Sequence, residues 1–245
     1  MADSQPILSI DGLRKSFGGL QAIDHVGFDV FRGEIVGLIG PNGAGKTTLF
    51  HLVSGFYRPD QGTISFKGVD LTRLRADQIC KIGISRAFQI VRPFIGLTIF
   101  QNVLVGSFNT AGNKREAHHQ CLKTLEVTGL VKFKDQLASR LTLAGKKRLE
   151  IAKALSTNPE ILLLDEVMAG LTPVEMEEII TLIRAINSRG VTIIAIEHVM
   201  AAIMSLSQRI VVLNYGKKIA EGTPEEISNN KDVIGVYLGE GNRTA

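Results

Sequence analysis

The sequence predicts an α/β fold in which a mixed or parallel sheet carries an N-terminal antiparallel β layer and an inserted helical sub-domain. Three observations lead to this prediction: short apolar runs in the first quarter, helical spacing in the middle, and alternating strand and helix patterns towards the C-terminus. A chain of 245 residues can bury a sizeable core within one such domain. We expect the domain core to comprise residues 1–88 and 158–245, and the helical sub-domain to comprise residues 89–157.

The first quarter of the chain contains short apolar runs that end at glycines, as is typical of β-strands. We expect strands at residues 7–10, 22–31, 34–39 and 63–66. Between residues 97 and 157 the spacing becomes helical, for example at Ala117, Cys121 and Leu125. Later, βαβ units and a parallel sheet are predicted from the alternation of helical stretches with apolar runs at residues 161–164, 191–196 and 210–213. We expect a loose tail at residues 241–245.

The composition excludes disordered and fibrous proteins, and the charge pattern indicates which partners to expect. The chain has 44% hydrophobic and 21% charged residues, which are ordinary values for a globular protein, and its net charge is +4. Because the basic residues are interleaved with acidic ones, nucleic acid is not expected as a partner. We also expect no secretory signal and no membrane span, since no apolar run approaches the ~18 residues that a span needs. Cys80 and Cys121 lack metal-binding spacing and are expected to be reduced, structural thiols in the cytoplasm.

A glycine-rich segment that begins at Gly40 predicts a phosphate-binding loop. It fits the pattern G-x-x-x-x-G-K-[ST], follows an apolar strand pattern and precedes a helical one. Glycines let the backbone N–H groups turn inward around phosphates, and the helix N-terminus favours negative charge. Lys46 would then bind the β- and γ-phosphates of a nucleotide, and Thr47 would bind Mg²⁺. The predicted nucleotide-binding residues in this segment are Gly40, Pro41, Asn42, Gly43, Ala44, Gly45, Lys46, Thr47 and Thr48.

Two adjacent acids follow the apolar run at residues 161–164. Neighbouring residues of a strand point in different directions, so Asp165 and Glu166 can do two different jobs. Asp165 suits a ligand of Mg²⁺, directly or through water, and Glu166 suits the base that takes a proton from the attacking water. A solvated acidic pair at a strand end is the alternative, and the phosphate loop elsewhere in the chain disfavours it.

With these motifs and several further positions, residues 9–238 resemble the ATPase subunits of ABC transporters. Phe17, in RKSFGG, matches the aromatic residue that stacks on adenine in that family, and a core strand aromatic is the alternative. Gln89, in ISRAFQ, matches the glutamine that contacts Mg²⁺ and water beside the surface for the membrane subunits. His198 matches the switch histidine that hydrogen-bonds the γ-phosphate, whereas a lone histidine at a strand end is usually structural. The resemblance implies catalytic roles for these two residues together with Lys46 and Glu166.

The segment Leu141-Thr142-Leu143-Ala144-Gly145 resembles the signature loop Leu-Ser-Gly-Gly-Gln of the family, with departures. Thr142 keeps a hydroxyl that can cap the following helix and donate to the γ-phosphate of ATP bound by a second subunit. Ala144 replaces a glycine and would be strained outside the right-handed backbone region, and Gly145 replaces the glutamine. Val167 replaces the proline that commonly follows the two acids, and Thr172 stands where Asp or Asn is usual.

The resemblance is sharper for subunits that energise branched-chain amino-acid importers, through the segments ISRAFQIVRPF, KRLEIAKAL and EGTPEEISNNKDVIGVYLGE. It implies an ATPase that uses ATP and Mg²⁺ as a peripheral subunit at the cytoplasmic face of the membrane. The implied partners are a second ATPase subunit (an identical copy or a paralogue), membrane-spanning permease subunits and an extracytoplasmic solute-binding protein. Urea and amide importers share these features, so an ATPase of such an importer is an alternative.

Other functions fit the sequence less well. A soluble ABC ATPase of DNA repair or translation would keep the catalytic residues, but such proteins usually carry long coiled-coil insertions or tandem ATPase units. This chain has a single phosphate loop. A P-loop kinase or GTPase would not predict Gln89, Thr142 and His198 in this order, and the guanine motif Asn-Lys-x-Asp is absent. A subunit that has lost hydrolysis is disfavoured because all the catalytic residue types are present.

Overall fold

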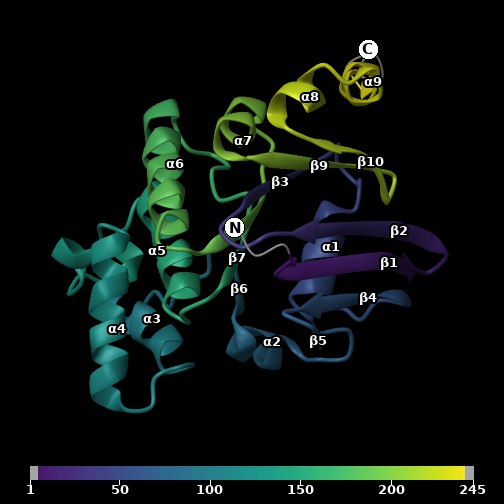
Figure 1. Ribbon diagram of the computed structural model, residues 1–245. Coiled ribbons are helices and arrows are strands. Elements are labelled where there is room, and N and C mark those ends of the chain that lie inside the picture. Colours follow the sequence, from purple (N-terminus) through teal and green to yellow (C-terminus); the bar gives the residue numbers. More distant parts are fainter. Residues whose placement is uncertain (1–4, 241–245) are drawn as a thin grey trace. The chain divides into compact units, whose positions relative to one another are not determined.

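The computed structural model describes residues 5–240, which form two compact units (Figure 1). The first unit contains the described residues up to Ala76 and those from Ile194 onwards, and the second unit is Asp77–Ile193. The predicted helical sub-domain at residues 89–157 lies within the second unit, and its boundaries remain a prediction. The predicted tail at residues 241–245 lies outside the described residues.

One sheet of the first unit is antiparallel and has the strand order β2-β1-β4-β5. Its strands are β1 (Leu8–Phe17), β2 (Leu20–Val30), β4 (Gln61–Phe66) and β5 (Val69–Asp70). Leu8 of β1 lies opposite Val30 of β2 and Phe66 of β4. The sheet confirms the predicted N-terminal antiparallel layer. β1 is longer than the predicted strand, because its more polar second half continues to pair with β2 as far as Phe17.

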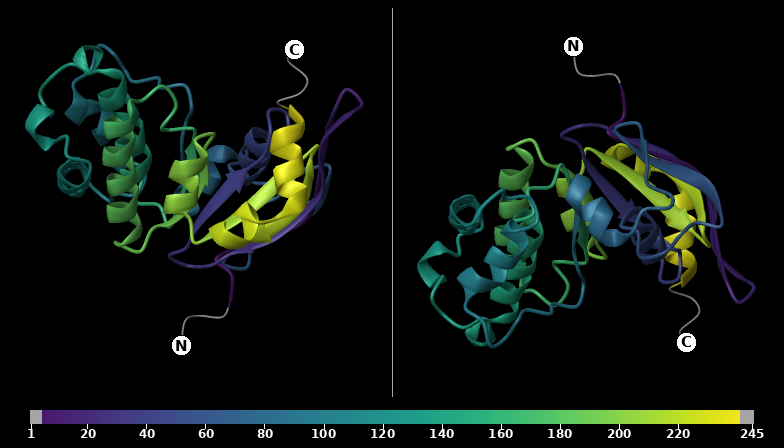
Figure 2. Two further views of the ribbon diagram at one scale, coloured as in Figure 1. Left: turned by 90° about the horizontal axis from the view of Figure 1, so that it is seen from above. Right: turned by 90° about the horizontal axis from the view of Figure 1, so that it is seen from below.

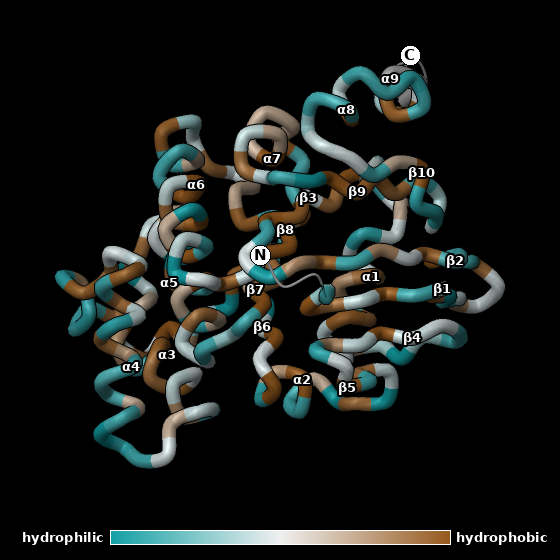
Figure 3. The backbone as a smooth tube through the Cα atoms, viewed as in Figure 1, coloured by the Kyte–Doolittle hydropathy of each residue, from teal (hydrophilic) through white to brown (hydrophobic). Residues whose placement is uncertain are grey.

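A second group of strands in the first unit is mixed. It consists of β3 (Ile35–Ile39), β9 (Arg209–Asn214) and β10 (Lys217–Gly222). β9 pairs with β3 in parallel and with β10 in antiparallel orientation. β3 is buried along its whole length, and Figure 3 shows β3 and β9 as strongly hydrophobic stretches. Both strands confirm predicted apolar runs, whereas the charged residues of β10 leave it without an apolar signal in the sequence.

The helices in the described part of the first unit are α1 (Lys46–Val53), α7 (Met200–Leu206), α8 (Pro224–Ser228) and α9 (Lys231–Glu240). α8 and α9 pack on β10, and the views of Figure 2 show both helices, in yellow, beside that strand. α7 lies so close to β3 that a Cβ atom at Gly37 would come within 2.9 Å of Ile203 Cγ1. The glycine therefore lets the helix pack directly on the strand.

In the second unit, β6 (Ile84–Ala87) and β7 (Ile161–Asp165) pair in parallel, and β7 is fully buried. α2 (Ala76–Ile82) precedes β6, and β8 (Thr192–Ile196) lies where the chain returns to the first unit. The apolar runs at residues 161–164 and 191–196 are therefore strands, as predicted. The parallel pairings β3–β9 and β6–β7 confirm the predicted α/β class.

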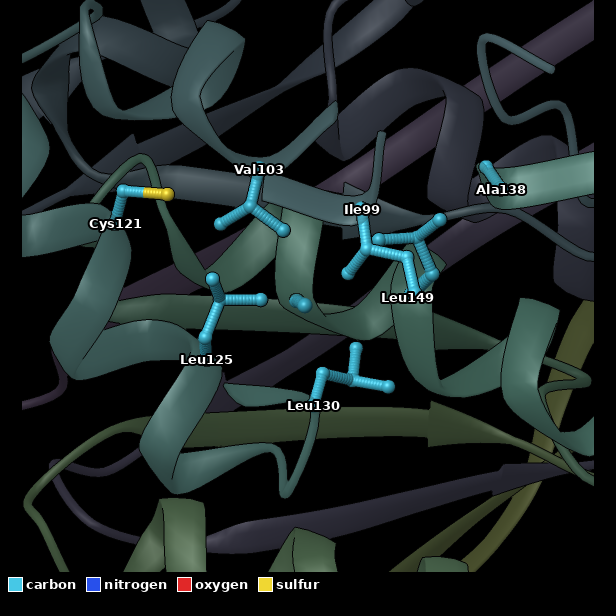
Figure 4. Packing of buried hydrophobic residues seen from close by; sticks show 8 residues of the cluster. Ile99, Val103, Cys121, Leu125, Leu130, Ala138 and Leu149 are labelled. Carbon is cyan, nitrogen blue, oxygen red and sulfur yellow. The ribbon is translucent and has the colours of Figure 1, made fainter. Parts of the chain in front are cut away.

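The middle of the chain is helical, as its residue spacing predicts. The helices are α3 (Ile99–Ser107), α4 (Lys114–Val127), α5 (Leu143–Leu155) and α6 (Pro173–Asn187). Figure 4 shows the apolar cluster that joins α3, α4 and α5 and includes Val103, Leu125 and Leu149. Ala117, Cys121 and Leu125 are fully buried on α4, and burial raises the pKa of the Cys121 thiol to about 12. Within residues 5–240, no helix has both the length and the apolar character needed to cross a bilayer.

Candidate functional site

The phosphate loop connects β3 to α1, which confirms the predicted context of strand, loop and helix. Gly40, Gly43 and Gly45 all have positive φ angles, of 149°, 78° and 103°. A Cβ atom at Gly40 would overlap the carbonyl of Leu213, and one at Gly45 would lie 2.5 Å from the carbonyl oxygen of Ala22. At Gly40 and Gly45, backbone conformation and space both exclude a side chain, whereas at Gly43 only the positive φ disfavours one. The glycines of the motif thus allow a tight backbone cradle.

A distant hairpin holds the phosphate loop from outside. The N–H of Gly216, in the turn between β9 and β10, donates to the carbonyl of Ala44 at 3.0 Å, and its own carbonyl accepts from Asp24 N–H at 2.8 Å. A trans peptide is planar, so its C=O and the following N–H point in opposite directions. The carbonyl of Ala44 points to the hairpin, and the N–H of Gly45 is therefore directed away from it. The hairpin fixes the orientation of one N–H group of the loop.

Lys46 is the first residue of α1 and is 6% exposed. Its Nζ donates to the carbonyls of Gly40 (2.6 Å) and Pro41 (2.9 Å). The ammonium group therefore lies against the phosphate loop. Thr47 is exposed and Thr48 is half-buried. Thr47, which the motif predicts to bind Mg²⁺, is therefore on the surface.

Phe17 lies at the end of β1 and is 40% exposed, so the alternative of a core aromatic is wrong. Its ring meets the ring of Tyr57 edge to face, with centroids 5.1 Å apart, and Lys15 Nζ lies 5.4 Å from its centroid. Tyr57 in turn contacts the ring of His51 at 4.8 Å. A ring with this exposure is accessible to a flat base. The sequence pattern gives no signal for Tyr57.

The acidic pair lies at the end of β7, and both acids are buried: Asp165 is 2% exposed and Glu166 is 8% exposed. The alternative of a solvated pair is therefore wrong. Asp165 Oδ2 forms an ion pair with the buried side chain of Arg86, and Asp165 Oδ1 is buried without a hydrogen-bond partner among the described residues. Glu166 has a φ of 48°, the left-handed conformation that residues with side chains rarely adopt.

Gln89 lies in the loop after β6, and its Nε2 donates to Glu166 Oε2. The structure thus brings together, in the second unit, the glutamine and the acids that the sequence predicts as a site. It adds two residues that the sequence argument missed, Arg86 and Lys147. Arg86 is part of the same segment as Gln89, but an arginine in a strand pattern gives no sign of an acidic partner almost eighty residues later.

The signature-like loop precedes α5. Thr142 is the N-cap of this helix, and its hydroxyl accepts a hydrogen bond from Gly145 N–H at 3.2 Å, as predicted. Thr142 and Leu143 are exposed. Thr142 therefore lies on the surface at a helix N-terminus, a position that favours an anion.

Family comparisons are consistent with this geometry. The family model for ABC transporters matches residues 23–169, and the model for the branched-chain amino acid ATP-binding cassette transporter matches residues 217–242. The chain belongs to the ABC-transporter ATPase family. It is 44% identical to the high-affinity branched-chain amino acid transport ATP-binding protein LivG of Escherichia coli (strain K12), over 97% of this chain and 99% of LivG.

Two solved ABC cassettes also resemble the chain closely. An ATP-binding cassette of an ABC transporter in its ADP conformation has a TM-score of 0.88 and 28% identity, and covers 96% of this chain and 100% of its own. A dimeric cassette in a post-hydrolysis state, bound to ADP and Pi, has a TM-score of 0.78 and 25% identity, over 89% of this chain and 98% of its own. The predicted fold and the predicted ATPase family are thereby confirmed.

Some residues of this ABC ATPase differ from those that the family pattern has, and the structure shows how the chain accommodates two of them. Ala144 lies inside α5 and has no positive φ, so the backbone conformation that would strain an alanine does not occur at this position. Thr172 caps α6 in a reciprocal arrangement with Glu175, whose pKa is lowered because the Thr172 N–H and hydroxyl donate to the carboxylate. Val167 is buried, and nothing in the structure explains why it replaces a proline.

Proposed function

We propose that this ATPase energises an importer of branched-chain amino acids. The observation that carries the proposal is the similarity to LivG, which extends over nearly the whole of both chains and reaches the C-terminal segment. A shared catalytic core alone would support an ATPase and nothing about its cargo. In the proposed system the chain is a peripheral subunit at the cytoplasmic face of the membrane. It acts with permease subunits, an extracytoplasmic solute-binding protein and a second ATPase subunit.

Several residues of the first unit are proposed to bind ATP. Residues 40–48 surround the phosphates and bind them through backbone N–H groups, which Pro41 alone lacks, and the ammonium of Lys46 offsets the charge of the β- and γ-phosphates. Phe17, whose side chain is exposed, stacks on the adenine. His198, exposed after β8, hydrogen-bonds the γ-phosphate.

The donor set of the chain fits Mg²⁺. Hydroxyl, carboxylate and amide oxygens are the ligands that this ion prefers, and Asp165 Oδ1 is a buried oxygen without a hydrogen-bond partner in the described part of the chain. Thr47, Gln89 and Asp165 would hold the ion. When bound, Mg²⁺ supplies positive charge to the phosphate oxygens.

Glu166 is proposed to accept the proton of the attacking water. Its carboxylate is buried, and the amide of Gln89 already hydrogen-bonds it. A buried base with a fixed amide neighbour can orient water as well as deprotonate it. The oxygen of that water then bonds to the γ-phosphorus while the bond to the β-phosphate oxygen breaks, which gives ADP and phosphate.

ATP is proposed to lie between two subunits. Water weakens charge interactions at an open surface, so a second subunit that covers the nucleotide strengthens them. Thr142 is exposed at the N-terminus of a 13-residue helix and would contact the γ-phosphate held by the other subunit, together with Ala144 and Gly145. The related cassette whose structure is dimeric, with ADP and Pi bound, supports such a pair.

A mixing experiment tests the pair. The variants Lys46→Ala and Thr142→Arg should each be nearly inactive alone. After subunit exchange about half of the dimers are hybrids with one intact site, so activity should return to roughly a quarter of the parent value if sites act independently. A mixture no more active than the sum of its parts, with exchange confirmed by native mass spectrometry, would contradict the proposed trans contact. If the parent needs a paralogous partner, the same changes are compared in that pair.

The cargo is tested on the complete system. The tagged Glu166→Gln protein is purified from solubilised membranes, its partners are identified, and the parent complex is reconstituted in liposomes. We expect leucine with the solute-binding protein to stimulate ATP hydrolysis several-fold, and urea to have no effect. Stimulation by urea alone would favour the urea or amide importers, and purification without any membrane protein would favour a soluble ATPase.

A further inference from the structure

A buried lysine of α5 contacts both parts of the proposed catalytic pair. Lys147 is 3% exposed, and its Nζ donates to the main-chain carbonyls of Gln89 (2.8 Å) and Glu166 (3.0 Å). These carbonyls come from separate segments, the loop after β6 and the turn after β7. One ammonium group therefore joins two segments that are 77 residues apart in the chain.

The same two residues also touch through their side chains. Gln89 Nε2 donates to Glu166 Oε2, so Gln89 and Glu166 are linked directly through side chains and indirectly through their backbones and Lys147. Such a closed ring of contacts restricts both the position and the direction of the carboxylate. A single side-chain hydrogen bond would leave the backbone of each residue able to shift.

The backbone conformation of Glu166 needs neighbouring groups that hold it in place. Its φ of 48° is unfavourable for a residue with a Cβ atom, and such conformations persist when neighbouring groups hold them. The carbonyl of Glu166 accepts from Lys147 Nζ and also from Ala169 N–H at 3.3 Å. A charge-assisted hydrogen bond is the stronger kind of contact, so the lysine contributes most to holding the turn.

We propose that Lys147 is a positioning residue for ATP hydrolysis, which fixes Glu166 and Gln89 relative to each other. The inference rests on the proposed role of Glu166 as the base. Lys147 lies on the helix that Thr142 caps, five residues further along the chain, so the helix that meets the second subunit also carries the group that holds the base. Its contribution is to the chemical step and not to nucleotide affinity.

The test compares Lys147→Met with Lys147→Arg. Methionine keeps much of the length and loses the donor, so kcat should fall by about 10-fold or more while the Kd for ATP, measured by calorimetry, stays within about two-fold. Arginine keeps a cationic donor and should recover most of the lost activity. Lys153→Met is the matched control, because Lys153 also lies on α5 and donates to a loop carbonyl, that of Arg92, at 3.1 Å. This control should keep the parental kcat.

A double variant separates positioning from a merely structural role. In a Glu166→Gln background, Lys147→Met should cause no further loss of the residual hydrolysis, because the base through which it acts is absent. A further ten-fold loss, or a parental kcat in the folded Lys147→Met protein, would overturn the inference. If Lys147→Met folds poorly, Lys147→Leu, which also lacks a donor, is measured in its place, with the same expectation of lower kcat at unchanged Kd. Full activity of Glu166→Gln alone would instead overturn the proposed base.

Discussion

In the phosphate loop the backbone turns at glycines, whereas in the turn after β7 it turns at Glu166, a residue with a long side chain. Both segments have a carbonyl held by a distant donor. In the loop the donor is the backbone N–H of Gly216, and in the turn it is the side chain of Lys147. The loop is therefore sensitive mainly to added atoms, and the turn mainly to changes of charge and hydrogen bonding. The predictions below test this difference.

The largest effect is expected from Glu166→Gln. The amide keeps the size of the side chain but cannot accept the proton of water, so ATP turnover should fall by about 10²-fold or more with nearly unchanged ATP binding. Steady-state hydrolysis and calorimetry measure the two quantities. Glu126→Gln, on the exposed face of α4, is the control with the same change of charge. Turnover of the Glu166→Gln protein within a few-fold of the parent would remove Glu166 from the role of base.

Gly45→Ala should weaken nucleotide binding, whereas Glu166→Gln should lower turnover and leave binding nearly unchanged. The new Cβ atom would lie 2.5 Å from the carbonyl oxygen of Ala22, at a φ of 103°. Strain of about 2 kcal/mol or more would weaken ADP binding by roughly 30-fold or more. Gly33→Ala provides the control, since Gly33 also has a positive φ, of 76°, but nothing lies within 4 Å of its Cβ position. Equal ADP affinities of the two variants would refute a steric basis for the loop.

Phe17→Ala probes a side chain that is proposed to touch the base of the nucleotide. Stacking of a base on an aromatic ring is worth about 1–3 kcal/mol, so binding should weaken by roughly ten-fold. The exposed Phe133, which lies in the second unit, serves as the control for loss of an aromatic ring. An unchanged Kd in the folded Phe17→Ala protein would assign Phe17 to the contact with Tyr57 alone.

The smallest effect is expected from Gly216→Ala, which acts on the loop from outside. The added Cβ would lie 2.8 Å from the carbonyl oxygen of Ala22 and disturb the hydrogen bond to Ala44. We expect ADP binding to weaken by about five-fold, since one net hydrogen bond is worth about 1 kcal/mol. Gly68→Ala is a close control: Gly68 lies in the β4–β5 turn at a φ of 79°, against 77° for Gly216, and its Cβ would meet nothing. If the two variants bind ADP equally, the hairpin does not orient the loop.

The sequence allowed the local parts of the site to be predicted, and left its long-range supports unknown. The strand before Gly40, the helix after it and the cap at Thr142 all depend on neighbouring residues, and each was predictable. The contacts of Gly216 and Lys147 depend on segments that only the fold brings together. A lysine within a helical pattern normally lies in solvent, so nothing in the spacing indicated that Lys147 is buried.

The strands show the same difference between features that the local sequence predicts and features that depend on the fold. β3, β7 and β9 are buried and apolar, and their runs were predictable from hydrophobicity. β10 has the sequence KKIAEG, in which three of six residues are charged, and none of its residues is buried. Its hairpin with β9, and hence the support of the phosphate loop, could not be derived from the pattern of apolar residues.

The β9–β10 turn also offers a position for a fluorescent label that reports nucleotide binding. Tyr215 is 77% exposed, and it directly precedes the residue whose N–H contacts Ala44. A dye attached to a cysteine at position 215 would stand in solvent, yet be covalently continuous with the support of the loop. Cys121 is fully buried, so replacing Cys80 with serine would leave the introduced thiol as the accessible one. The surface of the hairpin can thus report, as a fluorescence signal, when the loop behind it takes up a phosphate.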